Sequence, residues 1–199
     1  MRSSLIAPDA ERWVEVLSRS RHDFYHLPGY VEVSAREDGG EACALLVEEG
    51  QRELLLPLVM RPLPDGSTDA TSPSGYPGPV TSGESDDAWA STALAAGERY
   101  LAEQGTVTLF VRLHPLLDPS PPEDVGTIVQ HGDTVTVDLT LPEEEQWRSI
   151  RRNHRQQIRQ AKEAGYEAFV DDELRHYADF QRLYLQTMGR LGASEYYLF

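Results

Sequence analysis

The chain has 199 residues, of which 40% are hydrophobic and 26% charged, and its formal net charge is −15 at pH 7. This composition is typical of a globular protein, and the acidity argues against broad, non-specific coating of nucleic acid, so we expect no DNA partner. No apolar run is long enough to span a bilayer and the N-terminal apolar stretch is too short for a signal peptide, so we expect a cytoplasmic protein.

A first helix is predicted over residues 8–19. Asp9 is the expected cap, because a side-chain oxygen at that position can accept hydrogen bonds from the first free backbone N–H groups. Trp13, Val14 and Leu17 recur at helical spacing and are expected to face inward.

The following segment, 22–33, is aromatic and broken by a Pro-Gly pair. His22, Asp23 and His26 are residues of metal-ligating type. Three such residues at the edge of a loop are more often polar neighbours in a turn than metal ligands, so we expect no metal there.

Two strands joined by a tight turn are predicted over 42–47 and 53–60, with Gly50 in the turn. The second run is apolar on both faces, as in a central strand, although Pro57 indicates a bulge or an edge position. Cys43, the single cysteine of the chain, is expected to be a small core residue. It excludes an internal disulfide and an all-cysteine metal site.

A polar loop is predicted over 61–71, and the stiff loop S-P-S-G-Y-P-G-P-V follows at 72–80. Gly75 and Gly78 permit close approach of the backbone, while the prolines restrict it and Tyr76 is displayed between them. The loop is either a rigid connection with Tyr76 packed on the core or a binding loop. Its glycine spacing matches neither a dinucleotide fingerprint nor a phosphate-binding loop.

The next elements are a helix over 86–104, a strand over 106–113 and a Pro-rich loop over 114–125. The alternating run 127–140 predicts a hairpin that turns at 131–133.

The clearest helical period lies in residues 141–165, expected to begin at a capping box of Thr140 and Glu143 and to end at Gly165. Six of the chain's 18 Lys and Arg residues fall within it, which is unusual in so acidic a chain. The basic side is either a solvated surface or a phosphate-binding ridge. One side of the helix carries Trp147, Ile150, His154, Ile158 and Ala161, and the other carries Arg148, Arg152, Arg155, Arg159 and Lys162.

A short strand at 166–170 and a helix at 173–189 are predicted next. The chain then reaches an apolar, aromatic end, Tyr196–Phe199. Such residues require a partner surface, so we expect either a chain that has been cut short or a tail that tucks under the preceding helix.

Four stretches of the sequence form a recognisable set: S-P-S-G-Y-P-G-P (Ser72–Pro79), F-V-R-L-H-P-L-L (Phe110–Leu117), W-R-S-I-R-R-N-H-R-Q-Q-I-R-Q-A-K-E-A-G-Y-E (Trp147–Glu167) and Y-A-D-F-Q-R-L-Y-L-Q-T-M-G-R-L-G-A-S-E-Y-Y (Tyr177–Tyr197). They resemble the FemABX-like proteins of the GNAT (Gcn5-related N-acetyltransferase) superfamily. The similarity runs from about Tyr25 to Phe199, and the running order of helix, strand pair, stiff loop, helix and strand is typical of an acyltransferase-type mixed sheet.

The resemblance implies an α/β chain with a GNAT-like domain at 1–140 and, at 141–199, the opening helices and first strand of an incomplete second one. It implies an N-acyltransferase that moves an aminoacyl or acyl group from aminoacyl-tRNA or acyl-CoA to an amine, such as a cell-wall peptide precursor or a natural product. A second domain or a partner protein would cover the aromatic end. No good copy of the family's Q/R-x-x-G-x-G/A donor loop is present.

No nucleophile stands out in the sequence, so we expect direct attack of the amine in a ternary complex, without a metal. The alternative is a non-catalytic GNAT-like module that docks a partner through the basic helix and the aromatic end; a tRNA-binding adaptor is a third option. The expected substrate-binding residues are Tyr76, Arg112 and His114 in an acceptor cleft, Arg152, Arg155 and Arg159 on phosphates of a tRNA or nucleotide-linked precursor, and Tyr196 near the second sheet.

Overall fold

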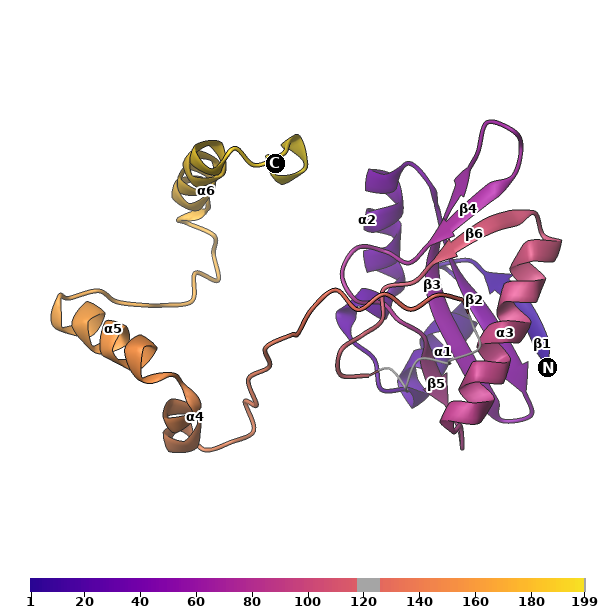
Figure 1. The fold of residues 1–199 in the computed structure, drawn as a ribbon, viewed down its shortest axis with the longest axis horizontal. Helices are drawn as coiled ribbons and strands as arrows, with labels where there is room; N and C mark the ends of the chain where they lie inside the picture. Colours follow the sequence, from indigo (N-terminus) through magenta and orange to yellow (C-terminus); the bar gives the residue numbers. More distant parts are fainter. Residues whose placement is uncertain (118–125, 199) are drawn as a thin grey trace. The chain divides into compact units, whose positions relative to one another are not determined.

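The computed structural model describes residues 1–117 and 126–198. The chain divides into two compact units, Met1–Thr134 and Val135–Phe199, each described by itself below. The first unit is a six-stranded mixed sheet with helices on both faces, which confirms the predicted α/β class (Figure 1).

The strands of the first unit follow the order β1-β2-β3-β4-β6, with β5 paired to β3 beside β4. All neighbouring strands are antiparallel except β4 and β6, which run parallel. The strands are β1 (Arg2–Ile6), β2 (Glu41–Glu49), β3 (Arg52–Pro62), β4 (Thr68–Thr71), β5 (Val80–Ser82) and β6 (Thr106–Phe110).

Strict alternation along β2 explains why the sheet is covered on both faces. Leu45 and Val47 lie in the cluster that packs against α3, whereas Ala44 and Leu46 lie in the cluster that packs against α1 and α2. The helices of this unit are α1 (Glu11–Arg19), the 3-10 turn η1 (Phe24–His26), α2 (Pro28–Asp38) and α3 (Asp87–Glu103).

The predicted strand pair and the helix after it are confirmed as β2, β3 and α3, and Asp86 caps α3 by accepting the N–H of Trp89 at 2.8 Å. Pro57 lies in the central strand β3. It is placed between the stretch that pairs with β5 and the stretch that pairs with β4, so neither partner opposes the residue that lacks an N–H donor.

Three predictions for the first unit are wrong. The segment 61–71 is largely strand, because β3 extends to Pro62 and β4 follows it. Val14 is 59% exposed and Val16 is buried in its place, and Ala10 occupies the N-cap of α1 with no side-chain cap from Asp9.

The Pro-Gly pair after η1 starts a helix instead of breaking one. Pro28 is the first residue of α2, where its missing N–H removes no intrahelical bond. The N-terminal strand β1 and the short polar strand β4 were not expected at all.

The second unit holds four short elements: α4 (Glu143–Ser149), α5 (Arg152–Glu163), α6 (Tyr177–Leu191) and the 3-10 turn η2 (Glu195–Tyr197). None of the described residues of α4, α5 and α6 is buried. This unit therefore consists of helices whose apolar sides lie open.

The predicted continuous helix over 141–165 is interrupted at Ile150 and Arg151, which are extended (ψ 135° and 143°). The expected capping box does not form, because Thr140 bonds Asp138 and Pro142 occupies the N-cap of α4. The last carbonyl groups of α4 find a donor in Arg155 instead, as described below.

The predicted hairpin over 127–140 and the predicted strand over 166–170 are also wrong, since neither stretch forms a strand. Val135 is 94% exposed and Val170 is 82% exposed. An alternating pattern predicts a strand only where a neighbouring strand supplies partners, and the described part of the second unit contains no sheet.

Candidate functional site

The candidate site lies at the carboxyl ends of β4 and β6, whose arrowheads end side by side in Figure 1. Open sheets bind ligands outside the carboxyl ends of parallel strands, where the outgoing chains separate. Here the chain leaving β4 enters the 72–80 loop, and the chain leaving β6 continues to Leu116. The two exits are fixed to each other, because Ser72 N–H donates to the Phe110 carbonyl at 2.8 Å and Arg112 N–H donates to Ser72 Oγ at 2.9 Å.

The 72–80 loop is held against the segment that connects α1 and α2. Gly75 has φ +90°, and a Cβ atom there would lie 2.2 Å from the Tyr25 ring, so only glycine allows this approach. Tyr30 Oη donates to the Ser74 carbonyl at 3.0 Å, and Ser74 N–H donates to Ser34 Oγ at 3.2 Å. These contacts hold the loop in one position.

Aromatic rings form a continuous cluster between this loop and η1. Tyr25 contacts Phe24, Tyr30 and Tyr76 at ring-centroid distances of 4.0, 5.4 and 6.0 Å. Tyr76 also approaches His114, at 6.4 Å. Because Tyr76 packs on one side and remains 45% exposed, it offers an aromatic surface to a ligand while its position is fixed.

His26, the last residue of η1, connects η1 to the 72–80 loop by a side-chain hydrogen bond. Asp23 N–H donates to its Nδ1 at 3.1 Å, so the neutral ring carries its hydrogen on Nε2, which donates to the Gly78 carbonyl at 3.0 Å. Burial lowers the pKa of His26 from its ordinary value. The side chain is fully buried, and its function is therefore to hold the loop in place.

His114 is only 7% exposed and has both ring nitrogens engaged. Leu116 N–H donates to Nδ1 at 3.1 Å, which places the hydrogen on Nε2, 3.2 Å from Asp23 Oδ2. Asp23 Oδ1 meanwhile accepts the N–H of Phe24 at 2.5 Å. His114 therefore positions the segments around it.

Arg112 lies across the two strand exits. Its Nη1 donates to the Ser72 carbonyl at 2.7 Å and to Thr71 Oγ1 at 3.3 Å, and its guanidinium lies 4.9 Å from the centre of the Phe110 ring. The structure therefore brings Tyr76, Arg112 and His114, the three predicted residues of the first unit, to one end of one strand pair.

The predicted residues of the second unit have other surroundings. Arg155 Nη1 donates to the carbonyls of Trp147, Arg148 and Ile150 at 3.3, 2.8 and 3.0 Å, so it caps α4 and is occupied structurally. Arg159 lies 5.8 Å from the Trp147 ring centre. Arg152 is exposed, and the side chain of Tyr196 lies outside the described residues.

Glu53 is a buried charged group that no pattern in the sequence predicts. It is 5% exposed and accepts hydrogen bonds from Arg12, Arg19 and Ser82, which tie α1 to β3 and β5. Burial raises the pKa of Glu53, but the Ser82 and Arg19 hydrogen bonds and the charges of Arg12 and Arg19 bring that pKa below its ordinary value. A carboxylate compensated in this way is a structural clamp.

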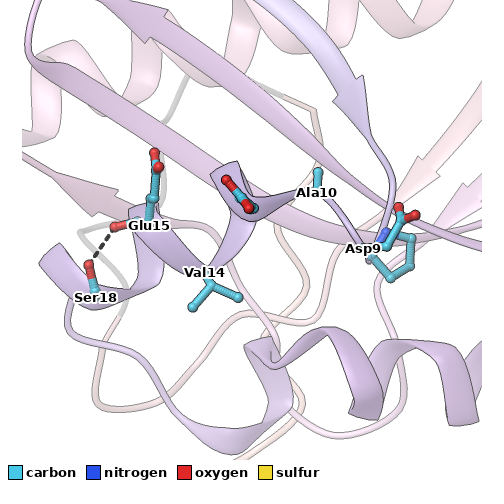
Figure 2. Close-up of a pocket in the computed structure, with 7 residues that line it drawn as sticks. Asp9, Ala10, Val14, Glu15 and Ser18 are labelled. Carbon is cyan, nitrogen blue, oxygen red and sulfur yellow. Dashed lines mark hydrogen bonds between the residues drawn. The ribbon is translucent and has the colours of Figure 1, made fainter.

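Two further features carry no chemistry. Burial raises the pKa of Cys43 to about 12, so its thiol stays protonated, as expected for a core cysteine. A depression at the start of α1, shown in Figure 2, is open and lined by exposed acidic and small residues, and Ser18 Oγ donates to the Glu15 carbonyl there at 2.7 Å. Its lining is Pro8, Asp9, Ala10, Glu11, Val14, Glu15 and Ser18.

Comparisons with known proteins add no family. No protein-family model matches the chain, and neither a curated protein nor a solved structure matches it. Across residues 1–117 and 126–198, no three His, Cys, Asp or Glu side chains are grouped so as to hold a metal ion. None of the helices described is both long enough and apolar enough to cross a membrane.

Proposed function

We propose that this chain is part of a cytoplasmic FemABX-like N-acyltransferase with a GNAT-like first domain. The observation that carries the proposal is the convergence of Tyr76, Arg112 and His114 at the carboxyl ends of the parallel strands β4 and β6. The order of α1, the β2–β3 pair, the stiff 72–80 loop, α3 and β6 supports it, because this order is typical of an acyltransferase-type mixed sheet.

The reaction that fits these residues is direct attack of an amine on the acyl donor. Cys43 has a raised pKa and lies in the core, so no thiolate is available to form an acyl-enzyme there. Tyr76 and Arg112 bind and orient the acceptor, and the His114–Asp23 pair holds the 72–80 loop and the β6 exit in register. In the second unit, taken by itself, Arg152 and Arg159 are exposed and would bind phosphates of the donor, acyl-CoA or aminoacyl-tRNA.

The test is acyl transfer by the full-length protein that contains this chain, because the chain alone is not expected to be active, with acetyl-CoA and with charged tRNA as donors over a panel of amines. Arg112→Gln is expected to lower kcat/KM at least about tenfold, because it removes a charged hydrogen-bond donor from the acceptor site. Arg99→Gln is the matched control, since Arg99 is exposed on α3. No turnover with either donor, or equal turnover in both variants, counts against the proposal.

A non-catalytic docking module is the second candidate, and the open helices of the second unit favour it. On α6, Phe180 is 58% exposed and Leu183 is 54% exposed. The dependence of binding on salt concentration distinguishes the two functions. Phosphate binding through Arg152 and Arg159 should weaken between about 50 and 200 mM salt, because the logarithm of the binding constant falls by about 0.7 for each phosphate contacted per tenfold rise in salt on a single-stranded nucleic acid. Docking through apolar helix faces does not weaken in this way.

A further inference from the structure

Arg112 differs from every other half-buried arginine of the first unit. Arg12, Arg52 and Arg61 are also half-buried, and each forms an ion pair with one or more carboxylates. Among residues 1–117 and 126–198, Arg112 has no carboxylate partner. Within the described residues Arg112 is thus a half-buried cation without an ion pair, in a chain of net charge −15, and an anionic ligand would supply the missing opposite charge.

The geometry of its guanidinium leaves one side available. All hydrogen bonds that Arg112 donates from its side chain to the described residues go through Nη1, to Ser72, Thr71 and, at 3.5 Å, the Pro73 carbonyl. The Phe110 ring supports one face of the plane. The Nε and Nη2 groups remain as two parallel donors in a fixed orientation, the fork that binds a carboxylate through both oxygens.

The surroundings favour a carboxylate over a phosphate. One guanidinium balances one negative charge, and the negatively charged Asp23 contacts His114 two residues farther along the same segment, which disfavours a dianion. Tyr76 and Phe110 are 45% and 51% exposed, so apolar surface is available beside the charge. A ligand that carries a carboxylate next to an apolar group satisfies both.

We propose that Arg112 is the anchor of a carboxylate-binding subsite at the carboxyl ends of β4 and β6. This inference rests on the proposed function, and what it adds is the residue that recognises a carboxylate on the amine acceptor. Arg112 holds the carboxylate through Nε and Nη2, and Tyr76 lies against the apolar part.

The experiment measures binding without turnover. The chain, labelled with nitrogen-15, is titrated with 3-phenylpropionate and with the uncharged 3-phenylpropionamide, and the amide signals of Gly75 and Phe110 are followed. We expect the carboxylate to bind about tenfold more tightly than the amide, since a charge-assisted bidentate contact is worth that much in a half-exposed site. Phenyl phosphate is expected to bind more weakly than the carboxylate.

Two variants and a control decide the role of Arg112. Arg112→Gln should abolish the preference for the carboxylate, and Arg112→Lys, which keeps the charge without the fork, should reduce it by several-fold. Arg99→Gln should leave it unchanged. If Arg112→Gln perturbs the fold, as judged by the spectrum of the β2–β3 pair, the Lys variant alone carries the test.

Equal affinity for the carboxylate and the amide overturns the inference, as does a preference that survives in both Arg112 variants. A tighter complex with phenyl phosphate overturns the carboxylate assignment. Failure here differs from failure of the proposed function: acyl transfer without carboxylate preference removes the subsite only, whereas carboxylate binding without acyl transfer removes the catalytic function only.

Discussion

Gly75 determines whether the 72–80 loop can lie against η1. Its φ of +90° is strained for any residue with a Cβ atom, and that Cβ would meet the Tyr25 ring. The ring is fixed in turn by Phe24 and Tyr30, so it has little room to withdraw. The absence of a Cβ atom at Gly75 therefore allows the loop position that places Tyr76, the exposed aromatic residue of the candidate site.

We predict that Gly75→Ala destabilises the protein by about 2–4 kcal/mol, from overpacking against Tyr25 and backbone strain together. The measurement is urea unfolding followed by tryptophan fluorescence. Gly50→Ala is the control, because Gly50 also has a positive φ (63°) but a Cβ there meets no atom within 4 Å, so strain alone costs about 1–2 kcal/mol. Equal losses in the two variants would show that the Tyr25 contact yields without cost.

Glu53 joins α1 to the sheet through a buried charge. We predict that Glu53→Gln lowers the free energy of unfolding by about 2–3 kcal/mol at pH 7, less than a fully buried pair because Arg12 and Arg19 are 35% and 49% exposed. Glu15→Gln, which removes an exposed partner of Arg12, is expected to change it by less than about 0.5 kcal/mol.

The natural protein and the Glu53→Gln variant also test the pKa of Glu53. A carboxyl group whose pKa is lower in the folded state stabilises the fold at pH values above its ordinary pKa of 4.5, and this contribution is lost as the pH falls through the lowered value. The difference in stability between the natural protein and Glu53→Gln should therefore be constant from pH 7 to 5 and shrink below pH 4.5. A difference that grows on acidification would contradict the lowered pKa.

At the scale of elements, the hydrophobic pattern was sufficient to predict those helices and strands whose apolar side chains form the core. β2, β3 and α3 contain most of the buried apolar residues; two apolar runs separated by a tight turn identified the strands, and helical spacing identified α3. β4 has the sequence T-D-A-T, which carries no strand pattern of its own. It is a strand because β3 and β6 pair with it on both sides, information that lies outside its own residues.

The need for a partner strand also explains why some predicted elements do not form. The run 134–139, T-V-T-V-D-L, alternates as well as any strand in the chain, yet it pairs with no described strand. In the helical stretch 141–165 the period persists through Ile150 and Arg151, whereas the backbone does not. Helical periodicity says nothing about how the carbonyl groups at the end of α4 find hydrogen-bond donors. Arg155 supplies these donors by bonding three carbonyls that a continuous helix would have bonded with its own N–H groups.

The residues of the candidate site were chosen through family resemblance and not through hydrophobic pattern, and their binding role stays a prediction. The structure places Tyr76, Arg112 and His114 at one end of the β4–β6 pair. The Asp23–His114 and His26–Gly78 hydrogen bonds could not be predicted, because each joins residues that are far apart in the sequence and become neighbours only in the folded chain.

At the scale of the whole molecule, the two units differ in how they are stabilised. The first has two apolar clusters on the faces of a sheet. In the second, α4, α5 and α6 are 7, 12 and 15 residues long and contain no buried residue among those described. Isolated helices of such length are marginally stable in water.

We therefore predict that amides in α4–α6 exchange with deuterium at least about 100-fold faster than those in β2 and β3, since local opening there requires little free energy. Hydrogen exchange of the complete chain read by mass spectrometry is the measurement. Peptides from α3, a helix that buries Trp89 and Leu101 on the sheet, provide the comparison within the same sample. Protection of α6 equal to that of α3 would show that the second unit is held by contacts of its own.

The parallel pairing of β4 with β6 also bears on synthesis of the chain on the ribosome. Thr71 is made well before its partner Phe110, and at about 5–20 residues per second the interval lasts about 2–8 s. During that time the nascent sheet ends in an unpaired β4 edge, which is open to pairing with another nascent chain. Translation that slows after β4 has emerged from the ribosome and before β6 emerges would lengthen this exposure, whereas slowing after β6 has emerged would not.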